Sequence, residues 1–349
     1  MKSALGLLLS LGIAVLAVLS HRLPAIHMID AMLIAIALGI AVRNGLGLPQ
    51  ACVPGVRFAV QKVMPFGIVL MGAKLDFFAV VRTSATALAI SVICVATALV
   101  LTITMCRRIG VGQKLGMLIG VGTAICGGTA IAVTAPVIEA DDHDTAFAIA
   151  TVTLFGMLAL FTFPLIGSAL GMSQLEFGVW AGTSVHHTPQ VVATGFAYGQ
   201  EAGEVATIVK LVRVLLLAPV VVGFGVWYGR EKRRREIAHV TRVGKLTTLF
   251  PPFILGFVLL ALANTLNLLP DFTLHLRDSF AWPQQDLRVA LAPLITTVST
   301  FLLTVAMAGV GLGVDLRGLA QVGYKALYVG FAAALVLAAF SFALLKVML

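Results

Sequence analysis

The sequence predicts an all-α polytopic membrane protein with about eleven transmembrane helices. Two observations lead to this class. Hydrophobic residues make up 60% of the 349 residues, and charged residues make up only 11%, whereas soluble domains carry roughly 25% charged residues. Runs of mainly apolar residues also follow one another along the whole chain, each near the length of about 20 residues that spans a bilayer. We therefore expect residues 1–349 to form a single membrane domain.

The first predicted span has two interpretations. Lys2 precedes a short apolar run, which is also the pattern of a secretory signal peptide. No small-residue cleavage motif follows the run, because the next residues are His21, Arg22 and Leu23. We therefore expect a retained helix. In chain order the predicted spans are 3–20, 26–43, 57–75, 84–106, 114–138, 145–170, 177–199, 205–228, 248–268, 289–312 and 323–347.

Basic residues gather in alternate loops between these spans. Cytoplasmic loops of membrane proteins are enriched in Lys and Arg, so this pattern predicts a cytoplasmic N-terminus and an external C-terminus. The run Arg230–Arg235 is read as a topology anchor, with contact to anionic lipid as the alternative. The predicted inside set is Lys2, Arg43, Arg57, Lys62, Arg107, Arg108, Lys114, Arg230, Lys232, Arg233, Arg234, Arg235, Arg242, Lys245, Arg317 and Lys325. The predicted outside acids are Asp141, Asp142, Asp144, Glu201, Glu204, Asp271, Asp278 and Asp286.

The eleven spans divide into one extra N-terminal helix, 1–20, and two sets of five, 26–170 and 177–347. A set with an odd number of spans is inverted relative to its copy. Inverted repeats with broken crossing helices are a common transporter plan, and the binding site then lies near the bilayer midplane. Short sequence echoes support the repeat but leave its register open between two pairings: 120–123 with 309–312, or 72–76 with 311–315.

A first polar stretch, Gly122–Ala130, interrupts the fifth predicted span. Each Gly inside a helix costs about 1 kcal/mol relative to Ala, so Gly127-Gly128 favours a break. The N-terminus of the half-helix after a break would attract an anion. Close helix packing through small residues is an equally consistent interpretation. The candidate binding residues here are Thr123, Cys126, Gly127, Gly128 and Thr129.

A second polar stretch, Gly182–Gln190, interrupts the seventh predicted span. Pro189 lacks an N–H group and frees a carbonyl one turn earlier. Histidine carries protons near neutral pH, so we favour a substrate or proton-handling site over ordinary core histidines. No acidic or cysteine ligand stands at metal-binding spacing nearby, and no metal is expected. The candidate residues are Ser184, His186, His187, Thr188 and Gln190.

Lys210 and Arg213 are one helical turn apart in the eighth predicted span and share a helix face. Cations inside a membrane mark a transport pathway or an ion pair. We therefore expect them either to bind an anion or to pair with Glu201 and Glu204. The acids of the chain fall near predicted helix ends. Several buried bases without buried acids favour an anionic substrate.

The sequence lacks the motifs of common enzyme sites. It contains no nucleotide-binding P-loop, no HExxH metal helix and no GxSxG nucleophile elbow. We expect no enzymatic activity, no catalytic residue and no cofactor. The expected partners are a small inorganic or organic anion and membrane lipid, with a homodimer left open. Nucleic acid is not expected, because the excess of basic residues lies in short loops.

Three blocks of sequence resemble the YeiH-like family of bacterial membrane proteins, which are described as sulfate exporters. They are Gly122–Ile138, Ala181–Gly199 and Val209–Pro219, and Ala306–Leu316 also fits. The resemblance spans essentially the whole chain. It implies an inner-membrane transporter of sulfate or a related small oxyanion, and kinship with transporters built from two five-helix inverted repeats.

Taken together, these features predict a secondary transporter domain for a small anion, with sulfate export as the specific expectation, driven by a proton or ion gradient. Two alternatives remain at this point. One is a cation/proton antiporter of related fold, which would need a membrane-buried acid. The other is a membrane receptor that binds an anion without transporting it.

Overall fold

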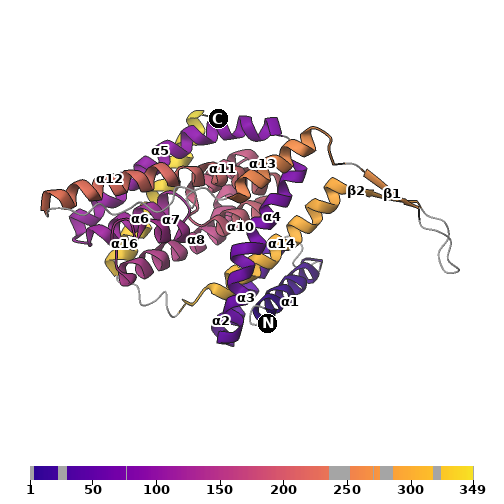
Figure 1. Cartoon of the computed structure of the whole chain (residues 1–349), viewed down its shortest axis with the longest axis horizontal. Helices are drawn as coiled ribbons and strands as arrows, with labels where there is room; N and C mark the ends of the chain where they lie inside the picture. Colours follow the sequence, from indigo (N-terminus) through magenta and orange to yellow (C-terminus); the bar gives the residue numbers. More distant parts are fainter. Residues whose placement is uncertain are drawn as a thin grey trace. The chain divides into compact units, whose positions relative to one another are not determined.

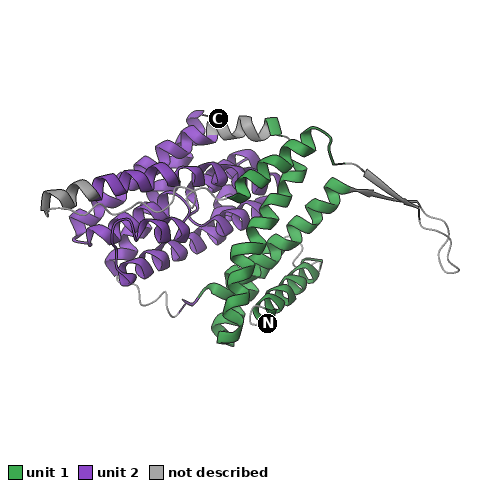
Figure 2. Cartoon of the chain, viewed as in Figure 1, with its two compact units in different colours: residues 1–82, 251–314 green, residues 83–250, 315–349 purple. Residues whose placement is uncertain are grey.

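The computed structural model describes residues 4–22, 30–75, 77–235, 252–269, 271–275, 286–316 and 324–348. Lys2, Arg242, Lys245, Asp278 and Arg317, which were assigned to loops above, lie outside these residues. The chain forms two compact units (Figure 2). Unit 1 comprises residues 1–82 and 251–314, and unit 2 comprises residues 83–250 and 315–349. This division differs from the predicted one into 26–170 and 177–347, because each unit takes segments from both.

The polytopic helical class is confirmed. Among the described residues, seven helical segments are long and apolar enough to cross a membrane. They are Ala4–His21, Gln50–Lys74, Ala87–Ile109, Asp142–Ala169, Gln200–Tyr228, Leu291–Gly313 and Tyr324–Met348. Two shorter apolar helices, Ala31–Gly45 and Pro252–Thr265, accompany them.

Unit 1 is a helical assembly in which α2 and α14 pack along each other, with α1 against both (Figure 1). A two-stranded antiparallel sheet pairs Thr273 with Arg288, so the all-α prediction missed this short element. α14 runs unbroken through 309–312, where the pairing of 120–123 with 309–312 would place a break. The elements are α1 (Ala4–His21), α2 (Ala31–Gly45), α3 (Val53–Phe58), α4 (Met64–Met71), α13 (Pro252–Thr265), β1 (Asp271–His275), β2 (Asp286–Ala290) and α14 (Leu291–Gly313).

Unit 2 contains both polar stretches. Its long helices surround four short ones, α6, α7, α9 and α10, which have only 12, 7, 11 and 11 residues. A helix of 11 residues is about 16 Å long, roughly half of the hydrocarbon core. The elements are α5 (Phe77–Ile109, entering from unit 1), α6 (Gln113–Ala124), α7 (Gly128–Thr134), α8 (Asp142–Ala169), α9 (Gln174–Ser184), α10 (Thr188–Tyr198), α11 (Gln200–Leu215), α12 (Leu217–Arg235) and α16 (Tyr324–Met348).

The helices α6 and α7 fold back on each other as a hairpin. Lys114, at the start of α6, donates from Nζ to the carbonyl oxygen of Glu139, just after α7, at 2.5 Å. The entry and exit of this segment therefore lie at the same end of unit 2. The prediction that 114–138 crosses the membrane is wrong, and so is the assignment of 141–144 to the side opposite Lys114.

The helices α9 and α10 form a second hairpin. Gln174, at the start of α9, accepts through Oε1 from the backbone N of Glu201 at 3.0 Å, at the start of α11. The rings of Phe177 and Tyr198 stack with centroids 3.9 Å apart, which joins the outer ends of the two helices. The predicted crossing at 177–199 is therefore also wrong. We call the two turns tip 1 (125–127) and tip 2 (185–187).

The two hairpins enter unit 2 from opposite ends. The 28-residue helix α8 follows the first hairpin and leads into the second, and its length of about 42 Å exceeds the hydrocarbon core. Lys114 also lies over the Tyr228 ring at 5.8 Å, so the C-terminal half of α12 passes beside the start of α6. Lys346 of α16 pairs with Glu176 at the opposite end. Both tips therefore lie between the two ends of unit 2.

Candidate functional site

The two tips touch through Gly127 and His187. A Cβ atom at Gly127 would lie 2.6 Å from His187 Nδ1. The next amide, of Gly128, donates to the same Nδ1 at 3.4 Å. The Gly127 backbone has φ +69° and ψ −128°, a combination that is accessible essentially to glycine alone. The close approach of the tips therefore depends on this glycine.

His187 is held in one protonation state by its neighbours. Its Nε2 lies 3.1 Å from Thr153 Oγ1 on α8, and that hydroxyl donates its only hydrogen to the carbonyl of Ile149 at 2.7 Å. Thr153 must then accept from His187 Nε2–H, while Nδ1 accepts from Gly128. The geometry assigns a neutral ring with its hydrogen on Nε2. Adding a proton to Nδ1 would displace the Gly128 amide and loosen the contact between the tips.

Lys210 and Arg213, both on α11, bind the two tips together from the protein interior. Lys210 Nζ donates to the carbonyl oxygens of Ile125 at 2.7 Å, Val185 at 3.0 Å and His186 at 2.5 Å. Arg213 donates from Nε to Ala124 at 2.5 Å, from Nη1 to Gly182 at 3.3 Å and to Thr183, and from Nη2 to Thr123. Both side chains are 0% exposed.

These contacts supply hydrogen-bond donors to carbonyl groups at the C-terminal ends of α6 and α9. The last four carbonyls of any helix lack intrahelical partners and carry its negative dipole end. Here Arg213 bonds two of these four carbonyls in each helix, and Lys210 bonds the carbonyls that follow the two helix ends. Lys210 and Arg213 were predicted to pair with Glu201 and Glu204 as one alternative. All the hydrogen bonds given above go instead to backbone carbonyls.

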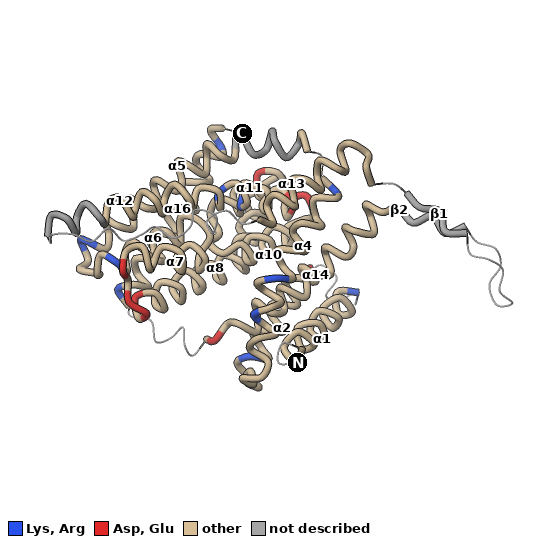
Figure 3. The backbone as a smooth tube through the Cα atoms, in the orientation of Figure 1, with Lys and Arg blue, Asp and Glu red and all other residues tan. Residues whose placement is uncertain are grey.

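The opposite faces of the tips carry positive helix ends. α7 begins at Gly128 and α10 at Thr188, and the first N–H groups of a helix have no intrahelical partner. Thr129 is exposed, while Gly128, His187 and Thr188 are half-buried. None of the acidic side chains whose burial is described is buried. This accessible face therefore combines polar groups with two positive helix ends, and no buried carboxylate of the described residues opposes them, which favours an anion. Blue segments on α11 lie among uncharged tan ones in Figure 3.

The remaining predicted residues lie behind this face. Within the described residues, Thr123 Oγ1, Ser184 Oγ and His186 Nδ1 are buried and have no hydrogen-bond partner. Gln190 links tip 2 to α8. Its Nε2 donates to the Thr153 carbonyl at 3.1 Å, and its Oε1 accepts from the His187 amide at 3.4 Å. Cys126 is buried within tip 1. The sequence analysis missed Thr153, since a single Thr inside an apolar span carries no distinguishing signal.

Small residues bring α9 close enough to α11 for the cations to reach their carbonyls. A Cβ at Gly182 would lie 2.7 Å from Val209 Cβ and 2.9 Å from the Ala206 carbonyl oxygen. Close approach through small residues is the usual way helices pack in membranes. Gly182 is therefore a packing residue, a role that the sequence analysis considered only for the glycines of Gly122–Ala130.

We expect Gly182→Ala to destabilise the protein, because the added methyl group must push α9 away from α11 and weaken the Arg213 contacts. Overpacking of this kind costs about 1–3 kcal/mol. Thermal unfolding of the purified protein measures the loss. Gly223→Ala on α12 is the matched control, since a Cβ there meets nothing within 4 Å. Equal melting temperatures for the two variants would contradict the packing role.

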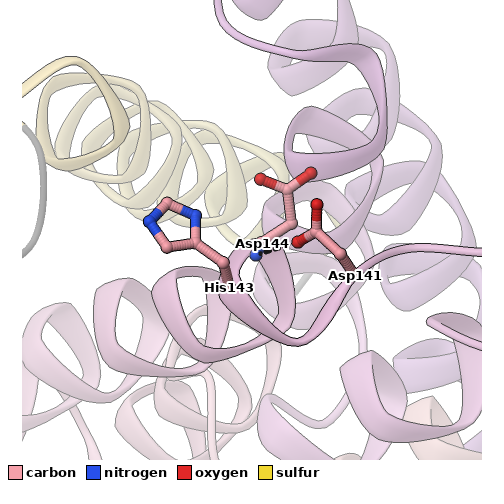
Figure 4. Close-up of side chains that lie close together, drawn as sticks. All are labelled: Asp141, His143 and Asp144. Atoms are coloured by element: carbon pink, nitrogen blue, oxygen red, sulfur yellow. Dashed lines mark hydrogen bonds between the residues drawn. The ribbon is translucent and has the colours of Figure 1, made fainter.

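A separate group of charged side chains lies at the start of α8. Asp141, His143 and Asp144 bring their ligand-type atoms within 4.8 Å of one another (Figure 4). Asp141 caps the helix by accepting from the Asp144 amide at 2.7 Å. Asp141 and His143 are exposed. Helix capping explains Asp141 without an ion.

Comparison with known proteins places the chain among bacterial membrane proteins. Residues 5–330 match the family model described as "Conserved hypothetical protein 698". A UPF0324 membrane protein of Yersinia pestis is 35% identical over 313 residues, covering 86% of this chain and 79% of the relative. A relative of the same description from Bartonella henselae is 32% identical over 336 residues, covering 95% and 89%. One from Bacillus anthracis is 29% identical over 325 residues, covering 93% and 89%.

Proposed function

The chain belongs to the family described as conserved hypothetical protein 698, and from that premise we propose that it is a secondary membrane transporter of a small anion. The observation that carries the proposal is the meeting of two re-entrant tips around Lys210 and Arg213. Irregular backbone inside a membrane occurs where it is buried in protein or lines a cavity, and half-helix N-termini near the midplane are a common anion site in transporters.

The charge balance at the tips favours an anion over a cation. Lys210 and Arg213 place two positive charges in the interior, and the N-termini of α7 and α10 add two positive dipole ends. A cation/proton antiporter would need a buried carboxylate, and the described residues supply none. Gly128, Thr129, His187 and Thr188 form the accessible face that would contact the anion.

A tetrahedral oxyanion such as sulfate suits this face. Its oxygens are acceptors only, and Thr129 offers an amide N–H group while Thr129 and Thr188 offer hydroxyls. His187 is the candidate for coupling to a proton gradient, because protonation of Nδ1 would compete with the Gly128 amide. We place the protein in the bacterial cell membrane with a cytoplasmic N-terminus, so 139–144 is also cytoplasmic.

Sulfate flux into proteoliposomes under an imposed proton gradient tests the transport proposal. Wild-type protein should raise flux above that of empty liposomes. His187→Ala removes the acceptor of the Gly128 amide and should lower flux about fivefold, since a net hydrogen bond is worth roughly 1 kcal/mol. His143→Ala changes an exposed histidine and should transport normally.

A melting-temperature screen against sulfate, sulfite, thiosulfate and small carboxylates identifies the anion, because a ligand that binds the folded state stabilises it by mass action. Stabilisation by one anion without any flux would favour a non-transporting receptor. Neither stabilisation nor flux with any of these anions would overturn the proposal.

A further inference from the structure

We propose that the Lys210 ammonium is a built-in monovalent cation: it fills a carbonyl cage that would otherwise take a cation from solution, so the protein works without one. The part of this inference that concerns transport rests on the function proposed above. The cage consists of the carbonyl oxygens of Ile125, Val185 and His186.

The donors and acceptors in the cage match in number. An ammonium group has three N–H donors, and Lys210 Nζ uses them on three backbone carbonyls at 2.5–3.0 Å. Ile125 belongs to tip 1, whereas Val185 and His186 belong to tip 2. The group therefore binds both hairpins at once, as a bound metal cation or ammonium ion would. No carboxylate takes part, which distinguishes this contact from an ordinary buried ion pair.

A positive charge is needed where the two tips meet, to balance the negative helix ends. The carbonyl ends of α6 and α9 each carry a partial charge of roughly −0.5, and the tips bring them together. Arg213 satisfies Thr123, Ala124, Gly182 and Thr183, which leaves the cage carbonyls to Lys210. A cation tethered to α11 is present at high effective concentration, so solution cations have no vacancy to fill in the native protein.

Truncation of Lys210 should turn the cage into a site for a free cation. Lys210→Ala removes three methylene groups and the ammonium, which together correspond to n-propylammonium. We expect the purified variant to melt several degrees below wild type. Added n-propylammonium chloride should then raise its melting temperature saturably, through mass action. Tetramethylammonium has the same charge without N–H donors and should have no such effect.

Two controls separate this rescue from general salt effects. Lys346→Ala removes an exposed lysine that pairs with Glu176, and n-propylammonium should not stabilise it. Lys210→Met keeps an apolar side chain in place of the cation, and it should be destabilised without rescue. Equal responses of Lys210→Ala to n-propylammonium and tetramethylammonium would overturn the proposal.

If Lys210→Ala does not fold, even when it is produced in n-propylammonium, melting of the wild-type protein tests the proposal. Its melting temperature should be the same in sodium, potassium and choline chloride at equal ionic strength. A specific requirement for sodium or potassium would overturn the proposal. These melting experiments contain no transported anion, so their outcome is independent of whether the anion proposal fails.

Discussion

Arg213→Met should produce one of the largest losses of stability of any single substitution in unit 2. The guanidinium donates to four carbonyls at the ends of α6 and α9, and it is fully buried. A buried polar group that loses its partner costs about 1–3 kcal/mol, so the loss of several should total about 4 kcal/mol. A change of this size lowers the melting temperature by roughly 10 °C.

Arg213→Lys is the informative companion variant. It keeps the charge but lacks the planar fork that reaches both hairpins at once. We expect it to melt between wild type and Arg213→Met. If Arg213→Met were as stable as wild type, Arg213 would not hold the carbonyl ends together, and the account of the tips would be wrong.

Gly127→Ala should abolish transport. The added methyl group would lie 2.6 Å from His187 Nδ1, and φ +69° with ψ −128° strains any side chain, at a cost of roughly 1–3 kcal/mol. The tips must separate, so the Gly128 contact to His187 is lost. Flux in proteoliposomes measures the effect, and the melting temperature should fall by several degrees.

Gly171→Ala separates strain from steric clash. Gly171 has φ +59°, but a Cβ there meets nothing within 4 Å. This variant should lose about 1 kcal/mol of stability from its backbone conformation and keep full flux. Equal flux in Gly127→Ala and Gly171→Ala would show that contact between the tips is not required.

The sequence predicted the membrane class and the polar stretches, but it missed the two reversals of direction. Gly122–Ala130 and Gly182–Gln190 stand out because polar residues and glycine interrupt apolar runs. A hairpin of two half-length helices has nearly the same length and composition as one spanning helix, so hydropathy cannot distinguish them. The telling contacts are Lys114 with Glu139 and Gln174 with Glu201. These contacts join residues far apart in the sequence, and no local pattern encodes them.

The role of the intramembrane cations was also incompletely predicted. Lys210 and Arg213 were expected to bind an anion or to pair with Glu201 and Glu204. Their carbonyl contacts depend on the two reversals, which bring the ends of α6 and α9 to the same place. We now propose that the accessible N-termini of α7 and α10 contact the anion. Lys210 and Arg213 contribute positive electrostatic potential from the protein interior. The inverted-repeat register stays a prediction.

The central claim is that the two hairpin tips hold an anion between them. Its most direct test is protection of cysteines at the tips from a membrane-impermeant thiol reagent. Thr129→Cys and Thr188→Cys are introduced with Cys52→Ser, because the other three cysteines are buried. Gln200→Cys, at an exposed position at the start of α11, is the control. The account predicts that sulfate or a related oxyanion slows labelling at both tips several-fold, whereas chloride at equal ionic strength does not. Labelling rates at both tips that no anion of the panel changes would contradict it.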